Sequence, residues 1–156
     1  MRLLLALAAM LLVPPTAGAT IVPQEGMKGV RLGMTVTAVQ DELGEPSEST
    51  IERDEIIGRV RVLRYGLTEM SFDGTRSSSR MLSVTTTSKT ERLSNGIGIG
   101  STRAAVDAKV RRATCRVEFG LDHCYIGSFV PGRVVTDFLI SKTGKVKRIV
   151  VGRVID

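Results

Sequence analysis

The sequence predicts an α+β protein of two tandem repeats, each a helix followed by a three-stranded meander. The repeats are expected to form one antiparallel sheet with the helices packed on one face. Three observations support this prediction: a segment at residues 29–43 recurs without a gap at residues 96–110, apolar residues follow helical spacing within the repeated segment, and period-2 runs between turn residues follow it. One repeat is too small to cover its own sheet, so the two should share a core.

The internal repeat is the most informative feature of the chain. Five positions are identical in the two copies: Gly29/Gly96, Gly33/Gly100, Thr35/Thr102, Ala38/Ala105 and Val39/Val106. Each copy reads as a short extended entry, a glycine turn and a helix. The repeat divides the chain into a first repeat at residues 20–89 and a second at residues 90–156.

Each predicted helix starts at a threonine. The hydroxyl oxygens of Thr35 and Thr102 can accept hydrogen bonds from the unpaired N–H groups of a first helical turn. In the first copy, Thr37 and Gln40 offer an alternative capping box. The second helix is expected from about Arg103 to Arg112.

Short strands are predicted after each helix, where apolar and polar residues alternate between turn residues. In the first repeat they are expected at Arg59–Tyr65, Thr68–Asp73 and Met81–Ser88, and in the second at Tyr125–Phe129, Val134–Ser141 and Lys145–Val154.

Residues 1–19 are predicted to be a cleavable secretory signal peptide. Arg2 precedes an apolar run at residues 3–13, and the small residues Ala17 and Ala19 form a cleavage pattern. The run is shorter than the roughly 20 residues of a membrane span, and no later segment is long enough to be one. Cleavage after Ala19 with no nearby cysteine predicts a soluble periplasmic or secreted protein, not a lipoprotein. An uncleaved N-terminal anchor is the alternative.

Two cysteines, Cys115 and Cys124, are expected to form a disulfide, because export would place them in an oxidising compartment. A redox-active pair is disfavoured because the spacing is far from C-x-x-C. A zinc site is disfavoured because only His123 could join the cysteines, whereas structural zinc takes four ligands. No metal or cofactor is therefore expected.

Charge and composition restrict the function. The chain carries 22 Lys and Arg against 16 Asp and Glu, which favours acidic partners or simply solubility. Nucleic acid is a poor candidate because Trp is absent and aromatic residues are few. His123 adjoins Cys124, but a disulfide removes the thiol nucleophile, so we expect an exposed loop histidine and no enzymatic activity. A small hydrolase is the least favoured hypothesis.

Basic residues mark the candidate binding surface. Arg59, Arg61 and Tyr65 alternate along one predicted strand. Lys145, Lys147 and Arg153 are expected on one face of the last predicted strand. If these side chains occupy the uncovered sheet face, they form a surface suited to a protein or an anionic envelope component. An ordinary solvated sheet face is the alternative.

The pattern G-x-x-x-G-M-T-x-x-x-V-x-x-x-L-G-x-P at residues 29–46 resembles the opening motif of the SmpA/OmlA (BamE-like) domain. Two tandem copies resemble the architecture of beta-lactamase inhibitory protein, in which a disulfide occupies a place similar to that of Cys115 and Cys124. The resemblance implies an exported binding module, with inhibition of a secreted or periplasmic enzyme as the alternative. The missing lipidation cysteine and the absence of Trp depart from these families.

Overall fold

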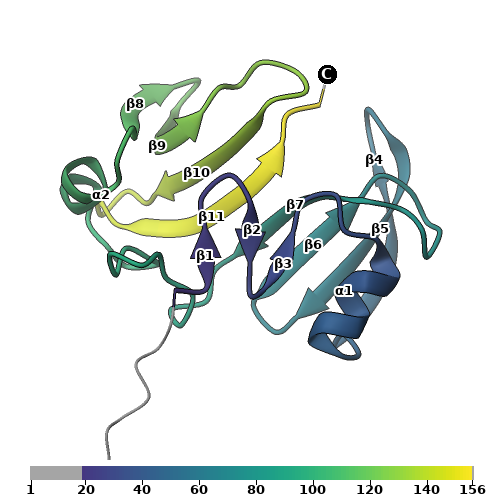
Figure 1. Cartoon of the computed structure of the whole chain (residues 1–156). Helices are drawn as coiled ribbons and strands as arrows, with labels where there is room; N and C mark the ends of the chain where they lie inside the picture. The colour runs from purple at the N-terminus through teal and green to yellow at the C-terminus, as the bar shows by residue number, and fades with distance from the viewer. Residues whose placement is uncertain (1–18, 156) are drawn as a thin grey trace, which may run out of the picture.

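The computed structural model describes residues 19–155, and this part of the chain is predominantly β (Figure 1). An eight-stranded antiparallel sheet and a three-stranded sheet account for most of the regular structure. The helices within this range are two short ones, α1 (Val36–Leu43) and α2 (Arg103–Lys109). The predicted α+β class, with repeats of one helix and a three-stranded meander, is therefore wrong.

The large sheet is built from strands that pair with their neighbours in sequence, except at its middle. Its strands are β4 (Glu48–Asp54), β5 (Gly58–Tyr65), β6 (Thr68–Phe72), β7 (Met81–Thr86), β8 (Thr114–Glu118), β9 (Leu121–Gly127), β10 (Val134–Ile140) and β11 (Val146–Arg153). Their order is β4-β5-β6-β7-β11-β10-β9-β8. The pairing of β7 with β11 therefore joins the two halves of the chain.

The two outermost strands, β4 and β8, are absent from the predicted set, whereas the six inner strands overlap their predicted ranges. In β4 no residue is buried, and in β8 none is either. β4 carries polar residues on both faces, which blunts pairing with other chains, and it therefore lacks the alternation by which strands are predicted. β8 does alternate polar and apolar residues, but it is only five residues long and its apolar residues are not buried.

A small sheet of β1 (Ile21–Val22), β2 (Gly26–Met27) and β3 (Val30–Arg31) lies across the junction of the two halves (Figure 1). Strand β2 contacts both β7 and β11. One apolar residue of each strand is buried: Ile21, Met27 and Val30. The small sheet, which runs into the start of the first repeat copy, therefore covers the seam of the large sheet.

The two helices begin in the same way. The Thr35 hydroxyl accepts from the backbone N–H three residues on at 3.2 Å, and the Thr102 hydroxyl does so at 3.1 Å, which confirms both predicted N-caps. The glycine turns also match: the Gly33 N–H donates to the first carbonyl of β7 and the Gly100 N–H to that of β11, both at 2.8 Å. The repeated residues thus hold each helix entry against the last strand of its half.

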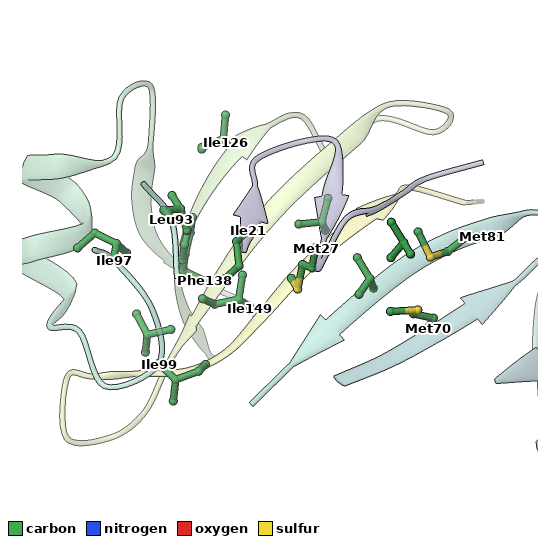
Figure 2. Packing of buried hydrophobic residues seen from close by; sticks show 14 of the residues in the cluster. Ile21, Met27, Met70, Met81, Leu93, Ile97, Ile99, Ile126, Phe138 and Ile149 are labelled. Atoms are coloured by element: carbon green, nitrogen blue, oxygen red, sulfur yellow. The ribbon is translucent and has the colours of Figure 1, made fainter. Parts of the chain in front are cut away.

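The core lies on one face of the large sheet, which we call the covered face. Val39 of α1, Val106 of α2 and the small sheet belong to one buried cluster with the strand residues. In Figure 2, Ile21 and Met27 lie beside Ile149 of β11. The opposite side of the sheet is called the open face.

The predicted signal peptide falls almost entirely on residues 1–18, which lie outside the described residues. Between residues 19 and 155, no helix has the length and apolar character needed to cross a membrane.

Candidate functional site

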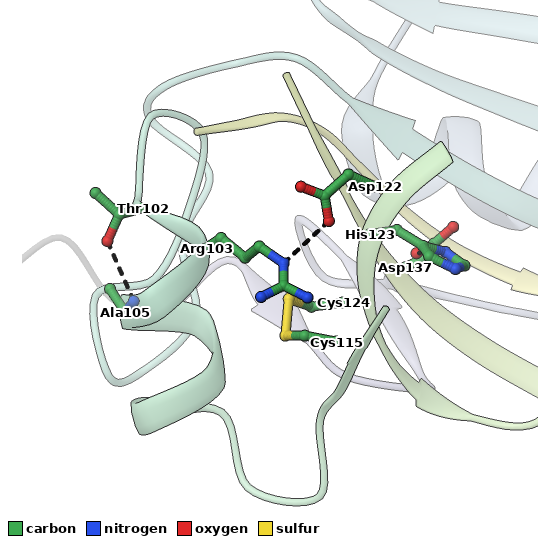
Figure 3. Close-up of a disulfide and its surroundings, with 8 residues drawn as sticks. All are labelled: Thr102, Arg103, Ala105, Cys115, Asp122, His123, Cys124 and Asp137. Carbon is green, nitrogen blue, oxygen red and sulfur yellow. Dashed lines mark hydrogen bonds and ion pairs between the residues drawn. A yellow bond between two sulfur atoms is a disulfide. The ribbon is translucent and has the colours of Figure 1, made fainter. Parts of the chain in front are cut away.

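A disulfide joins Cys115 and Cys124, which are directly opposed in the β8–β9 hairpin (Figure 3). This confirms the predicted pairing. Cys124 is fully buried on the covered face, under α2, which contacts both strands. Arg103 of α2 also bonds Asp122 of β9 at 3.0 Å. The bond is compatible with an exported protein, because such bonds persist in oxidising compartments.

Side chains alternate across a strand, so the residues flanking Cys124 lie on the open face. His123 contacts Asp137 of β10 through its Nδ1 atom, 3.0 Å from Oδ1. The imidazole centroid is 5.2 Å from that of Tyr125 and 5.7 Å from that of Phe129, and Arg116 lies over the Tyr125 ring at 5.3 Å. These five residues are called the His123 cluster.

The His123 cluster is enclosed even though it belongs to the open face. His123 is only 6% exposed, because Phe129 from the loop after β9 packs on it. Burial raises the pKa of Asp137, and the nearby His123 opposes this shift. The expectation of an exposed loop histidine is therefore wrong: His123 lies in β9 and is buried.

A histidine paired with a carboxylate also occurs in catalytic triads, where Nε2 serves a nucleophile. In the described part of this chain, His123 Nε2 is buried without a hydrogen-bond partner, and Glu118 Oε2 is 3.7 Å away. No hydroxyl or thiol there makes a hydrogen bond with it. The pair therefore lacks the third group that would make it a nucleophilic site.

A second cluster of charged residues occupies the other end of the open face. Arg64 of β5 bonds three carboxylates: Glu52 at 2.7 Å, Glu69 at 2.9 Å and Glu48 at 3.2 Å. The Arg64 guanidinium holds the pKa of Glu52 below its usual value, and the glutamates raise the pKa of Arg64. These four residues, the Arg64 cluster, make this end acidic, since three carboxylates surround one guanidinium.

By register, Thr85 of β7 and Val150 of β11 lie between Glu69 of the Arg64 cluster and Asp137 of the His123 cluster. A hollow of about 290 Å³ at this place is lined in part by Arg64, Thr85 and Arg148. The open face therefore combines an acidic end, a shallow centre and an aromatic end that carries arginine.

Three predicted site residues lie on the covered face. Arg59, Arg61 and Tyr65 share the side of β5 that carries the fully buried Leu63. The Arg61 guanidinium donates to a carbonyl of the β6–β7 loop at 2.7 Å, and the Tyr65 hydroxyl donates to the carbonyl that follows α1 at 2.9 Å. These three residues therefore do not lie on the uncovered sheet face, where the predicted binding surface required them to be.

The other three do not share one surface either. Arg153 lies on the same side of β11 as the buried Val151 and donates to the Gly132 carbonyl at 2.8 Å. Lys145 precedes β11, and Lys147 is the extra residue of a bulge opposite β10. Strict alternation fails at a bulge, so sequence spacing could not place Lys147 with Arg153.

Sequence reasoning missed the His123 cluster, and one signal could have indicated it. A cysteine in a disulfide is a strong candidate for the covered face, which places both neighbours of Cys124 on the open face.

Among residues 19–155, no three His, Cys, Asp or Glu side chains are arranged to hold a metal ion. The chain matches no protein-family model, and no curated protein or solved structure is significantly similar to it.

Proposed function

We propose that this protein is an exported, non-enzymatic binding module that engages a protein partner through the open face of the large sheet. The observation that carries the proposal is the arrangement of this face. An acidic Arg64 cluster and the aromatic His123 cluster flank Thr85 and Val150, and a hollow lined in part by Thr85 lies at this place. A surface of mixed chemistry with a shallow centre suits a protein better than a uniformly anionic polymer.

Four further features support export and binding. The N-terminal pattern of residues 1–19 is that of a signal peptide, and the disulfide is compatible with an oxidising compartment. The motif at residues 29–46 resembles the exported SmpA/OmlA (BamE-like) domain. Tyr125 and Phe129, with ring centroids 4.9 Å apart, supply the aromatic anchors that interfaces favour.

An inhibitor of a secreted or periplasmic enzyme is the second candidate. It shares the same surface, and the Tyr125–Phe129 pair is the feature that favours it, since aromatic side chains fill partner pockets at energetic centres of interfaces. The identity of the captured partner distinguishes the two: an envelope structural protein supports a binding module, and a single enzyme that loses activity on binding supports an inhibitor.

The proposal is tested by capture from an envelope extract on the immobilised chain, followed by quantitative mass spectrometry. Arg148→Glu reverses a charge on the open face, and Arg59→Glu is a matched reversal on the covered face; both arginines are exposed strand residues. We expect Arg148→Glu to reduce recovery of the partner at least about tenfold and Arg59→Glu to leave it unchanged. Equal losses from both variants would contradict the proposal.

A further inference from the structure

The tip of the β8–β9 hairpin exposes three apolar side chains. Phe119 is 103% exposed, Val117 67% and Leu121 50%. Single exposed apolar residues are ordinary on protein surfaces, but here three lie within five residues around one turn. Transfer of such a group out of water is favourable, so the tip is poised to bury itself against another phase or molecule.

The backbone of this turn is also unfavourable for its sequence. Phe119 has φ of 49° and Gly120 has φ of 77°, so both central residues are left-handed. That conformation defines a type I′ hairpin turn, which favours Asn-Gly, whereas a bulky residue at positive φ is an outlier. The chain thus keeps a phenylalanine where both solvation and backbone conformation disfavour it, which is characteristic of functional positions.

The acidic residues beside the tip are neutralised by ion pairs. Glu118 bonds Arg116 at 2.8 Å, and Asp122 bonds Arg103 at 3.0 Å. The disulfide joins the two strands of the same hairpin, which limits its rearrangement. The apolar tip is therefore presented on a stapled hairpin without net negative charge.

Free cations border the tip. Strands β9 and β10 are antiparallel, so the β10–β11 turn and the hairpin tip lie at the same end of the strands. A hollow of about 310 Å³ between the two turns is lined in part by Leu121, Lys142 and Lys147. Lys142 and Lys147 are exposed, and within residues 19–155 neither forms an ion pair.

We propose that the hairpin tip docks on an anionic phospholipid bilayer. Phe119 and Leu121 enter the apolar boundary below the headgroups, and Lys142 and Lys147 contact lipid phosphates at the hollow. An apolar protrusion bordered by unpaired lysines has the amphipathic pattern of membrane-surface segments, and this charge complementarity favours a bilayer over an apolar protein pocket. The tip lies at the strand ends, beyond the His123 cluster, and its membrane contact is a second interaction that goes beyond the proposed function.

The chain contains no Trp, so Phe119→Trp introduces a single fluorophore at the tip. The matched control is Ile56→Trp in the β4–β5 turn. Ile56 is 61% exposed, and this turn lies at the opposite end of the strands from the tip. With vesicles of phosphatidylglycerol and phosphatidylcholine, we expect a blue shift and quenching by brominated lipids for Phe119→Trp only. Absence of a shift, an equal shift with pure phosphatidylcholine, or a shift that requires added envelope protein overturns the proposal.

A second variant separates binding from stability. Phe119→Asn creates the favoured Asn-Gly turn, so it should raise the thermal midpoint while it reduces vesicle partitioning at least about tenfold. Lys142→Ala and Lys147→Ala should each reduce partitioning about fivefold, whereas Lys89→Ala, an exposed lysine after β7, should not. Unchanged partitioning of Phe119→Asn overturns the proposal even if the protein is more stable.

Discussion

The two halves of the large sheet carry different chemistry at corresponding strands. Arg64 lies in β5 between Glu48 of β4 and Glu69 of β6, whereas His123 lies in β9 beside Arg116 of β8. The Arg64 side chain is 28% exposed and the His123 side chain 7%. One half therefore carries a solvated network of ion pairs and the other a buried pair enclosed by aromatic rings.

On the covered face, by contrast, the two halves of the sheet are alike. Leu63 precedes Arg64 and Cys124 follows His123, and both are fully buried. The halves also share their threonine caps and glycine turns. This difference indicates that packing constrains the covered face, while the open face is free to carry recognition chemistry.

The largest effect is expected from the second half, which is the half with a disulfide. Replacement of both cysteines, Cys115→Ser with Cys124→Ser, should lower the free energy of unfolding by roughly 2.5–3 kcal/mol, because the unfolded chain regains the entropy of the short closed loop. Denaturant unfolding measures the loss. A free energy of unfolding that the double substitution leaves unchanged would contradict the account.

An intermediate effect is expected from the His123 cluster. His123→Ala leaves the Asp137 carboxylate buried without its partner and opens space beside Tyr125, so it should cost about 2 kcal/mol. Arg64→Ala removes exposed ion pairs and should cost less. The effect of Arg64→Ala should also shrink in high salt. Thermal unfolding at two salt concentrations makes the comparison, and a larger loss from Arg64→Ala would reverse it.

The smallest effects are expected in the pH dependence of the free energy of unfolding, where Glu52 and Asp137 should contribute with opposite signs. Arg64 lowers the pKa of Glu52 in the folded state, so its stabilisation is present above the ordinary value of 4.5 and is lost as the pH falls. Burial raises the pKa of Asp137, so its contribution is present below 3.8 and is lost as the pH rises through the folded-state pKa.

Glu52→Gln should remove the first dependence and Asp137→Asn the second. Unfolding free energies measured between about pH 3 and pH 7 for the wild type and both variants provide the test. Identical pH profiles for the three proteins would show that neither carboxylate is coupled to folding as described.

Much of the local structure could be predicted because it depends on neighbouring residues. The threonine caps follow from the repeated motif, and the disulfide follows from two cysteines in a chain that is predicted to be exported. The fold class could not be predicted in this way. The edge strand β4 is polar on both faces and the small sheet consists of two-residue strands, so neither leaves a periodic pattern, while β8 alternates over only five residues.

The candidate site was harder to predict because alternation does not say which face is covered. In β5, Leu63 is buried on the covered face, but Val60 and Val62 are buried on the open face. Both faces of this strand therefore look apolar, and Arg59 and Arg61 could be assigned to either. Only the packing of α1 and the small sheet distinguishes the two sides.

The central claim, that the open face contacts a protein partner, is tested most directly by site-specific photo-crosslinking. A benzophenone amino acid is placed at Thr85, beside the central hollow of the open face, and in a matched variant at Arg59 on the covered face. In envelope extract we predict a discrete crosslinked protein from position 85 and none from position 59. The same product from position 59 alone, or from both positions equally, would contradict the account.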